Sequence, residues 1–258
     1  DVLIEDPSAT LAAPWTQAIL GGITDYSAAV LTDGVFGSVT IGGSGMTSGD
    51  ISDNGRFIYQ SRTGDGILTA YIPSGLPSDG SARVALMIRA STANNAVMAA
   101  SVSSASGSFG AKLAYRSSAG SGTALVPSTN NTFLQPCWLR LTRSGVVFTA
   151  EASTDGAAWT LLGTSTLTGI PSTALWGLFH YSTDWSISTL GNYHLTFAQN
   201  LTLADLPLPS TPTGLNAIAT SPTAITLTWN SVAGASGYRI ERLSETNAFM
   251  QLVDVASA

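Results

Sequence analysis

The chain has 258 residues, and charged residues make up only 10% of them, whereas about 25% is usual for soluble domains. Its net charge of −6 and its single lysine, Lys112, provide no basic field that could collect phosphates, so nucleic acid is not expected as a partner. The single cysteine, Cys137, excludes an intramolecular disulfide and any cysteine-based zinc site. Together with 26 glycines, this composition is typical of a turn-rich β protein.

Strand-like runs separated by turn signals fill the chain up to about residue 204. This spacing predicts an all-β sandwich or jelly roll, and the lack of a sustained 3.6-residue period predicts few helices. We expect the first 25 residues to form an N-terminal arm that either wraps the sandwich or reaches a neighbouring molecule. The expected strands cover residues 56–60, 66–72, 83–90, 97–101, 112–116, 138–163 (three strands), 175–181 and 193–203.

Residues 138–163 predict three successive antiparallel strands. Leu139 and Leu141, then Phe148 and Ala150, recur with the period of two that places alternate side chains on one face of a sheet. The dipeptides at 144–145 and 155–156 are favoured in two-residue hairpins.

A composition break at residues 205–211 predicts a stiff, proline-rich domain linker. The expected domains are therefore residues 1–204 and residues 212–258. In the second domain, residues 224–230 and 235–242 predict further strands, and Trp229 and Tyr238 lie in them.

Residues 209–258 resemble the first half of a fibronectin type III domain, an immunoglobulin-like β-sandwich, in which a Trp of the second strand and a Tyr of the third pack in the core. Such a half-sandwich leaves an unpaired strand edge and an uncovered apolar face. Three explanations stay open: the polypeptide continues, the tail is partly disordered, or another copy of the chain supplies the missing strands by strand addition.

Residues 20–204 resemble a bacterial concanavalin A-like, LamG-like jelly-roll module. The resemblance rests on segments that occur in the family's order, while the loop at 181–192 looks longer and more aromatic than usual. It implies a non-catalytic glycan-binding or adhesive module of a secreted multidomain protein. The matching segments are Gly34-Val-Phe36 with Ile41-Gly-Gly-Ser-Gly45, Phe57-Ile-Tyr-Gln60, Thr63-Gly-Asp-Gly66, Ala85-Leu-Met-Ile-Arg-Ala-Ser91 and Trp138 to Gly163.

Two groups of residues are candidates for glycan binding. Tyr181, Asp184 and Trp185 combine aromatic faces, which stack on sugar rings, with a polar group that takes hydroxyls; alternatively, Trp185 folds back onto the sandwich or the linker. Arg89, Arg116 and Arg140 are each out of phase with apolar neighbours. If their strands share a sheet, they line one non-core face, either as a binding groove or as ordinary solvated charges.

Catalysis is not expected. Glucanases of this architecture carry acidic residues two apart on one strand, because an acid and a nucleophile must flank the scissile bond. The sandwich holds two glutamates, Glu5 and Glu151, and Glu151 has no acidic neighbour at that spacing. The two histidines, His180 and His194, lie near no Gly-x-Ser-x-Gly motif and lack the acidic cluster of a metal site.

No cofactor is expected, with calcium as the one ion to consider. Asp50, Asp53 and Asn54 offer oxygen ligands within one short loop. The alternative is a set of Asx turns that precedes the next strand.

The first hypothesis is therefore a secreted, non-catalytic module that binds polysaccharide or cell-surface glycan, or anchors a larger protein at a surface. The alternative is a structural subunit of an extracellular fibre, sheath or surface layer that assembles through residues 209–258. A glycoside hydrolase is the third hypothesis. No apolar run approaches the roughly 18 residues needed to span a bilayer. The start at Asp1 suggests export followed by removal of a leader, so we expect an extracellular location.

Overall fold

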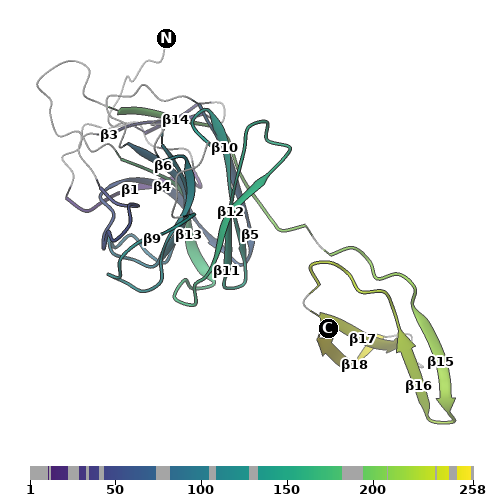
Figure 1. Cartoon of the computed structure of the whole chain (residues 1–258). Helices are drawn as coiled ribbons and strands as arrows, with labels where there is room; N and C mark the ends of the chain where they lie inside the picture. The colour runs from purple at the N-terminus through teal and green to yellow at the C-terminus, as the bar shows by residue number, and fades with distance from the viewer. Residues whose placement is uncertain are drawn as a thin grey trace, which may run out of the picture. The chain divides into compact units, whose positions relative to one another are not determined.

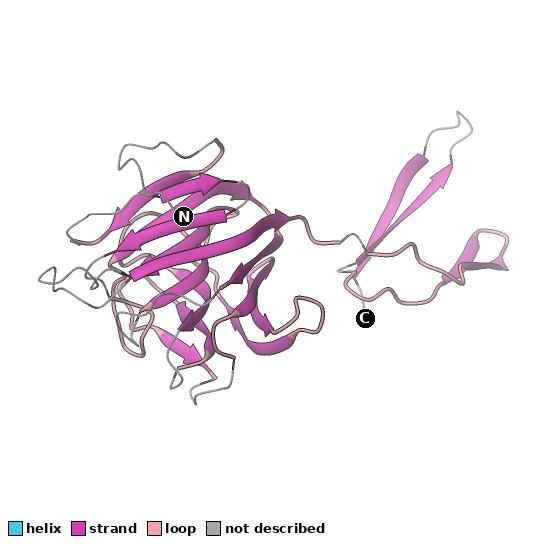
Figure 2. Cartoon of the chain, turned by 90° about the horizontal axis from the view of Figure 1, so that it is seen from above, coloured by secondary structure: helices cyan, strands magenta, loops and turns pink. Residues whose placement is uncertain are grey.

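The computed structural model describes residues 11, 13–22, 29–32, 35–40, 44–73, 82–104, 109–127, 133–181, 194–207, 209–235, 237–243 and 249–256. Every regular element in these residues is a β-strand (Figure 2), which confirms the all-β prediction. Within the same residues there is accordingly no helix that is long and apolar enough to cross a membrane. The chain divides into two compact units, Asp1–Leu206 and Pro207–Ala258. Their boundary falls inside the proline-rich segment.

The larger unit is built from two seven-stranded antiparallel sheets (Figure 1). Sheet A has the order β1 (Thr16–Leu20), β4 (Gly55–Thr63), β13 (Thr173–Tyr181), β6 (Arg83–Arg89), β7 (Met98–Ser104), β8 (Ala111–Arg116) and β9 (Ala124–Val126). Sheet B has the order β12 (Thr160–Thr166), β11 (Val147–Ser153), β10 (Cys137–Ser144), β5 (Gly66–Ile72), β14 (His194–Ala204), β3 (Val35–Thr40) and β2 (Ala29–Thr32). Strands far apart in sequence pair in both sheets, as β4 does with β13 and β5 with β14. This arrangement is a jelly-roll β-sandwich.

The main core lies between the two sheets. Leu139 and Leu141 of β10 and Leu86 and Ile88 of β6 all belong to it and are fully buried. Cys137 packs in the same layer as a small apolar residue, and its burial raises the pKa of the thiol to about 11. The apolar side chains that alternate in the sequence therefore point into this core.

The centre of sheet A is also buried on its second face. Every residue of β6 and β7 is buried, so the side chains that alternate with the main core are covered as well. They form a second cluster in which Phe57, Met98 and Phe179 pack with Met46 from the loop before β4. A side chain at the centre of sheet A that points away from the main core is therefore still shielded from solvent.

The three strands expected at residues 138–163 are confirmed as β10, β11 and β12, paired antiparallel in that order. A two-residue turn joins β10 to β11, since Ser144 pairs with Val147. The connection from β11 to β12 spans residues 154–159 and is longer than the two-residue hairpin expected there. The Asp155 carboxylate explains the difference, because it accepts hydrogen bonds from the amides of Ala157 and Ala158 and so stabilises a wider turn.

The smaller unit holds two separate antiparallel pairs. β15 (Asn216–Ser221) pairs with β16 (Ala224–Thr228), and β17 (Gly237–Leu243) pairs with β18 (Phe249–Ala256). Trp229 and Tyr238 meet edge to face, with ring centroids 5.2 Å apart and planes at 65°. Most other side chains described in this unit are exposed to solvent.

Candidate functional site

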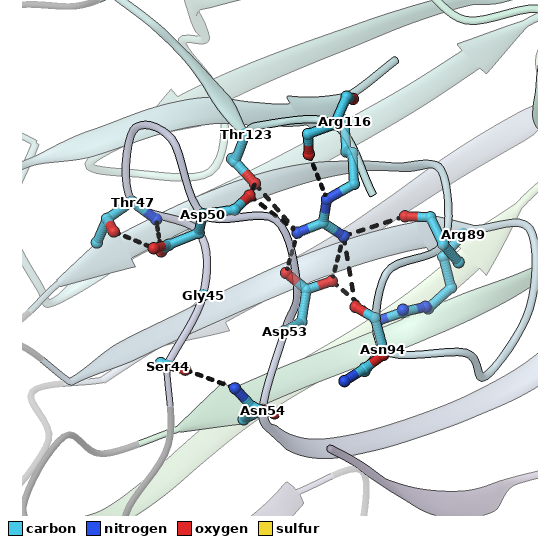
Figure 3. A network of polar contacts seen from close by, with 12 residues as sticks. Ser44, Gly45, Thr47, Asp50, Asp53, Asn54, Arg89, Asn94, Arg116 and Thr123 are labelled. Carbon is cyan, nitrogen blue, oxygen red and sulfur yellow. Dashed lines mark hydrogen bonds and ion pairs between the residues drawn. The ribbon is translucent and has the colours of Figure 1, made fainter. Parts of the chain in front are cut away.

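The loop of residues 44–54 is attached to sheet A by a buried carboxylate (Figure 3). Arg116 donates from both terminal nitrogens to Asp53, with Nη1 to Oδ2 and Nη2 to Oδ1 each at 2.9 Å. Arg89 Nη1 approaches Asp53 Oδ2 at 3.4 Å. All three side chains are completely buried. The sequence makes this possible because Arg89 and Arg116 end β6 and β8, where they lie beside the loop that carries Asp53.

The remaining donors of the two arginines bind backbone carbonyls of neighbouring loops. Arg116 donates to the carbonyls of Ala96 and Ser121, each at 3.1 Å. Arg89 donates to the carbonyls of Ser91, at 2.7 Å, and Ala93, at 2.5 Å. Three loops that are distant in sequence are thereby held together at one end of sheet A.

The charges of Arg89, Arg116 and Asp53 also indicate that this cluster has a structural role. Burial lowers the pKa of the Arg89 guanidinium to about 10, and the Asp53 carboxylate acts in the opposite direction. Arg89 therefore remains protonated at neutral pH. One carboxylate and a set of carbonyl oxygens stabilise two buried cations, which leaves no acceptor of Asp53 for an external ligand.

The contacts of Asp50, Asp53 and Asn54 do not favour a calcium site. Asp53 is engaged by the two guanidiniums, which would repel a cation. The Asp50 carboxylate instead accepts from the amide and hydroxyl of Thr47, and the Asn54 side chain donates to the Ser44 hydroxyl at 2.6 Å. These are local loop contacts that do not converge on one point. Over the described ranges, no three His, Cys, Asp or Glu residues come together in a way that could hold a metal ion.

The aromatic loop prediction fails at Tyr181 and is untested beyond it. The Tyr181 side chain is 1% exposed, its hydroxyl donates to the carbonyl of Gly45, and its ring lies 6.0 Å from that of Phe179. A ring packed in this way cannot stack on a sugar. Asp184 and Trp185 lie outside the described residues.

The prediction of one arginine-lined face is also wrong. Arg89 and Arg116 share sheet A and are buried, whereas Arg140 belongs to β10 of sheet B. Alternation along each strand correctly predicted that all three arginines point away from the main core. It could not indicate which sheet each strand joins, or that the second face of sheet A is covered.

A different group of side chains lies on the outer face of sheet B. Arg140 and Glu151 are direct cross-strand partners, with Arg140 Nε donating to Glu151 Oε2 at 2.6 Å. The Arg140 guanidinium carbon lies 4.1 Å from the centre of the Trp159 ring. On the next strand pair, Trp138 is opposite Tyr71, with ring centroids 5.4 Å apart and planes inclined at 51°. We call these five residues the outer patch.

All five members of the outer patch are partly exposed to solvent. Their strand neighbours Cys137, Leu139 and Leu141 point into the core, so the pleat directs Trp138 and Arg140 outward. The sequence contained part of this signal, because Trp138 and Arg140 alternate with the core residues. Tyr71 could not be added without knowing that β5 pairs with β10.

The turn before Trp159 shapes one border of the outer patch. Gly156 has φ of 75°, and a Cβ there would lie 2.9 Å from Trp138 Cε2, so only glycine lets the turn approach this ring. Hydrogen bonds from the amides of Ala158 and Ala157 lower the pKa of the Asp155 carboxylate, which keeps it ionised at neutral pH.

Neither a protein-family model nor a curated protein sequence matches the chain. Among solved structures, a functionally unknown protein from Saccharomyces cerevisiae is similar with a TM-score of 0.53 and 16% identity, over 75% of this chain and 97% of that one. The carbohydrate-binding module CBM66 from Bacillus subtilis has a TM-score of 0.46 and 16% identity, over 74% and 95%. A β-glucanase from Bacillus licheniformis has a TM-score of 0.45 and 12% identity, over 78% and 96%. At such identities the likeness concerns the fold, and the class defined here is a jelly-roll β-sandwich protein.

Proposed function

We propose that this chain is a glycan-binding module and that the outer patch is its binding surface. The observation that carries the proposal is the grouping of three partly exposed aromatic rings with an Arg–Glu pair on one open sheet face. Aromatic faces bind the apolar side of a sugar ring, and the charged pair provides donors and acceptors for its hydroxyls. Of the two aromatic candidates expected from the sequence, Tyr181 is buried and Trp185 lies outside the described residues.

The proposal includes a non-catalytic role. Glycoside hydrolysis needs a carboxylic acid and a second carboxylate on either side of the scissile bond. The Glu151 carboxylate is paired with Arg140, and the Asp155 carboxylate is bonded within its own turn. Neither is therefore poised to act as a general acid. Release of reducing sugar by the purified chain would contradict this part of the proposal.

We further propose that the module belongs to a secreted, extracellular protein with several domains in series. The larger unit would be LamG-like and the smaller one related to fibronectin type III domains. Two observations support this architecture: the proline-rich segment between the two units, and the contact of Trp229 with Tyr238. The test is location: antibody raised against this chain should detect the parent protein in culture medium or on intact cells.

Binding is tested by affinity electrophoresis of the full chain through gels that contain individual soluble polysaccharides. At least one polysaccharide should retard the protein, and Trp159→Ala should weaken the affinity severalfold, since an aromatic contact contributes about 0.5–1.5 kcal/mol. Ile51→Ala is the matched control, because Ile51 is an exposed apolar residue in the loop that is attached to sheet A. Equal loss in both variants would contradict the assignment of the outer patch. The variant Trp185→Ala tests the loop expected from the sequence.

The smaller unit supports a second candidate, a structural subunit that assembles with other copies of the chain. Leu215, Ile225 and Met250 are 70%, 67% and 58% exposed, an amount of apolar surface that favours association. If this role is correct, the chain should form oligomers in sedimentation velocity experiments, and Ile225→Thr should shift them toward monomer. A monomer at all concentrations would rule it out.

A further inference from the structure

The charges of the outer patch restrict the kind of glycan that it suits. The positive charge of Arg140 is compensated by Glu151, whose carboxylate lies 2.6 Å from Nε. Asp155, in the adjoining turn, adds a negative charge, and the whole chain carries −6. Among the described residues of the outer patch and its adjoining turn, the charged groups are thus one cation, Arg140, and two anions, Glu151 and Asp155. A polyuronate or a sulfated chain would meet net repulsion here and would have to compete with Glu151 for the guanidinium.

The hydrogen-bonding groups of the same pair suit neutral hydroxyls. Among the described residues, the Arg140 side chain makes its hydrogen bond from Nε, and Glu151 accepts it at Oε2. The terminal nitrogens of Arg140 and Oε1 of Glu151 are thus available beside the rings, with the two side chains 25% and 19% exposed. Donors and acceptors side by side match a sugar hydroxyl, which both donates and accepts.

The inclination of the rings restricts the shape of the ligand. The planes of Tyr71 and Trp138 differ by 51°, so one flat surface cannot lie against both. The ordered face of a crystalline polysaccharide is flat and rigid, whereas a single chain in solution can turn between successive sugar units. The outer patch is therefore better matched to a single chain than to a crystal surface.

We infer that the ligand of the outer patch is a neutral polysaccharide in the form of single, soluble chains, an inference that rests on the proposed glycan-binding function. Polyuronates and crystalline surfaces are the ligand classes that it excludes. Binding through hydroxyls and ring faces also predicts little dependence on ionic strength, because no net charge is neutralised when the ligand binds.

The experiment compares three probes with the full chain: soluble neutral polysaccharides (mixed-linkage glucan, xylan and galactomannan), polygalacturonate, and microcrystalline cellulose. Dissociation constants are measured at 50 and 500 mM NaCl. The expected result is saturable binding to at least one neutral chain, less than a twofold change with salt, and little binding to the other two probes. Trp159→Ala and Tyr71→Ala should each weaken binding severalfold, while Ile51→Ala should not.

Glu151→Gln separates the ligand classes further, because it removes the negative charge and retains an acceptor. Neutral-chain affinity should not rise in this variant, because loss of the carboxylate charge adds no attraction for an uncharged ligand and weakens the contact that orients Arg140. Preferential binding of polygalacturonate that weakens with salt and strengthens in Glu151→Gln would overturn the inference and leave the glycan-binding function standing. Preferential binding to cellulose would likewise overturn the inference and leave the glycan-binding function standing. Failure to bind any of the three probes would overturn the proposed function itself.

Discussion

Removal of the Asp53 carboxylate should be the most damaging single change to a polar side chain in the larger unit. Asp53→Ala leaves the Arg89 and Arg116 guanidiniums without their counter-ion, and all three side chains are completely buried. Breaking a buried ion pair by removal of one partner costs about 3–5 kcal/mol, because the remaining charge is neither solvated nor compensated. The unit's unfolding free energy should fall by that amount, which is a large fraction of the roughly 5–15 kcal/mol of an ordinary domain.

The measurement is urea unfolding followed by tryptophan fluorescence. With a slope of about 2.5 kcal/mol per M, the midpoint should fall by roughly 1–2 M. The matched control is Asp205→Ala, since Asp205 also pairs with an arginine, Arg62, but its side chain is 92% exposed. That change should cost no more than about 1 kcal/mol. Equal midpoints for the two variants would refute the reasoning from burial.

A second substitution tests whether uncompensated charge is the cause. Adding Arg89→Met to Asp53→Ala removes one of the two stranded cations and keeps an unbranched apolar side chain in its place. Part of the lost stability should return, so the two effects should not add. Further destabilisation by the full cost of an independent mutation would show that lost packing, and not charge, is responsible.

Two other predictions follow from the packing of the sandwich. Cys137 should not react with a thiol reagent at pH 8 until urea unfolds the protein. Because burial raises the pKa of its thiol from 9.0 to about 11, the unfolded state loses this proton first, and the urea midpoint should fall as pH rises from 9 to 11. Gly177→Ala should cost about 2–3 kcal/mol, since its Cβ would lie 1.9 Å from the carbonyl oxygen of Ile58. Gly22→Ala, with nothing within 4 Å of the added atom, should leave the thermal midpoint nearly unchanged.

The strands were largely predictable because side-chain alternation is a local property. The expected strand at residues 66–72 matches β5 at both ends, and the three strands at 138–163 appear as β10, β11 and β12. The hairpin at 155–156 was predicted too short, because a side-chain carboxylate stabilises the wider turn. Turn dipeptides indicate where a chain reverses, but hydrogen bonds from nearby side chains determine the length of the loop.

The candidate site was less predictable because it depends on which strands become neighbours. Arg89, Arg116 and Arg140 show the same local pattern, and yet two of them bind Asp53 inside the protein while the third lies beside Trp159 on an open face. The loop sequence by itself predicts a possible calcium ligand at Asp53, because it does not indicate that two arginines approach from β6 and β8. Such partners are separated by tens of residues and meet only in the folded sheet.

The sequence by itself determined the all-β class, the positions of most strands, the proline-rich boundary and the side chains that face the main core. These follow from period-two alternation and turn chemistry, which act over a few residues. Only the tertiary structure decided that the centre of sheet A is covered on both faces and that five side chains converge on sheet B. These are Tyr71, Trp138, Arg140, Glu151 and Trp159. The physical reason is that alternation assigns a side chain to one of two faces, whereas pairing and layer packing determine which neighbours it meets there and whether water reaches it.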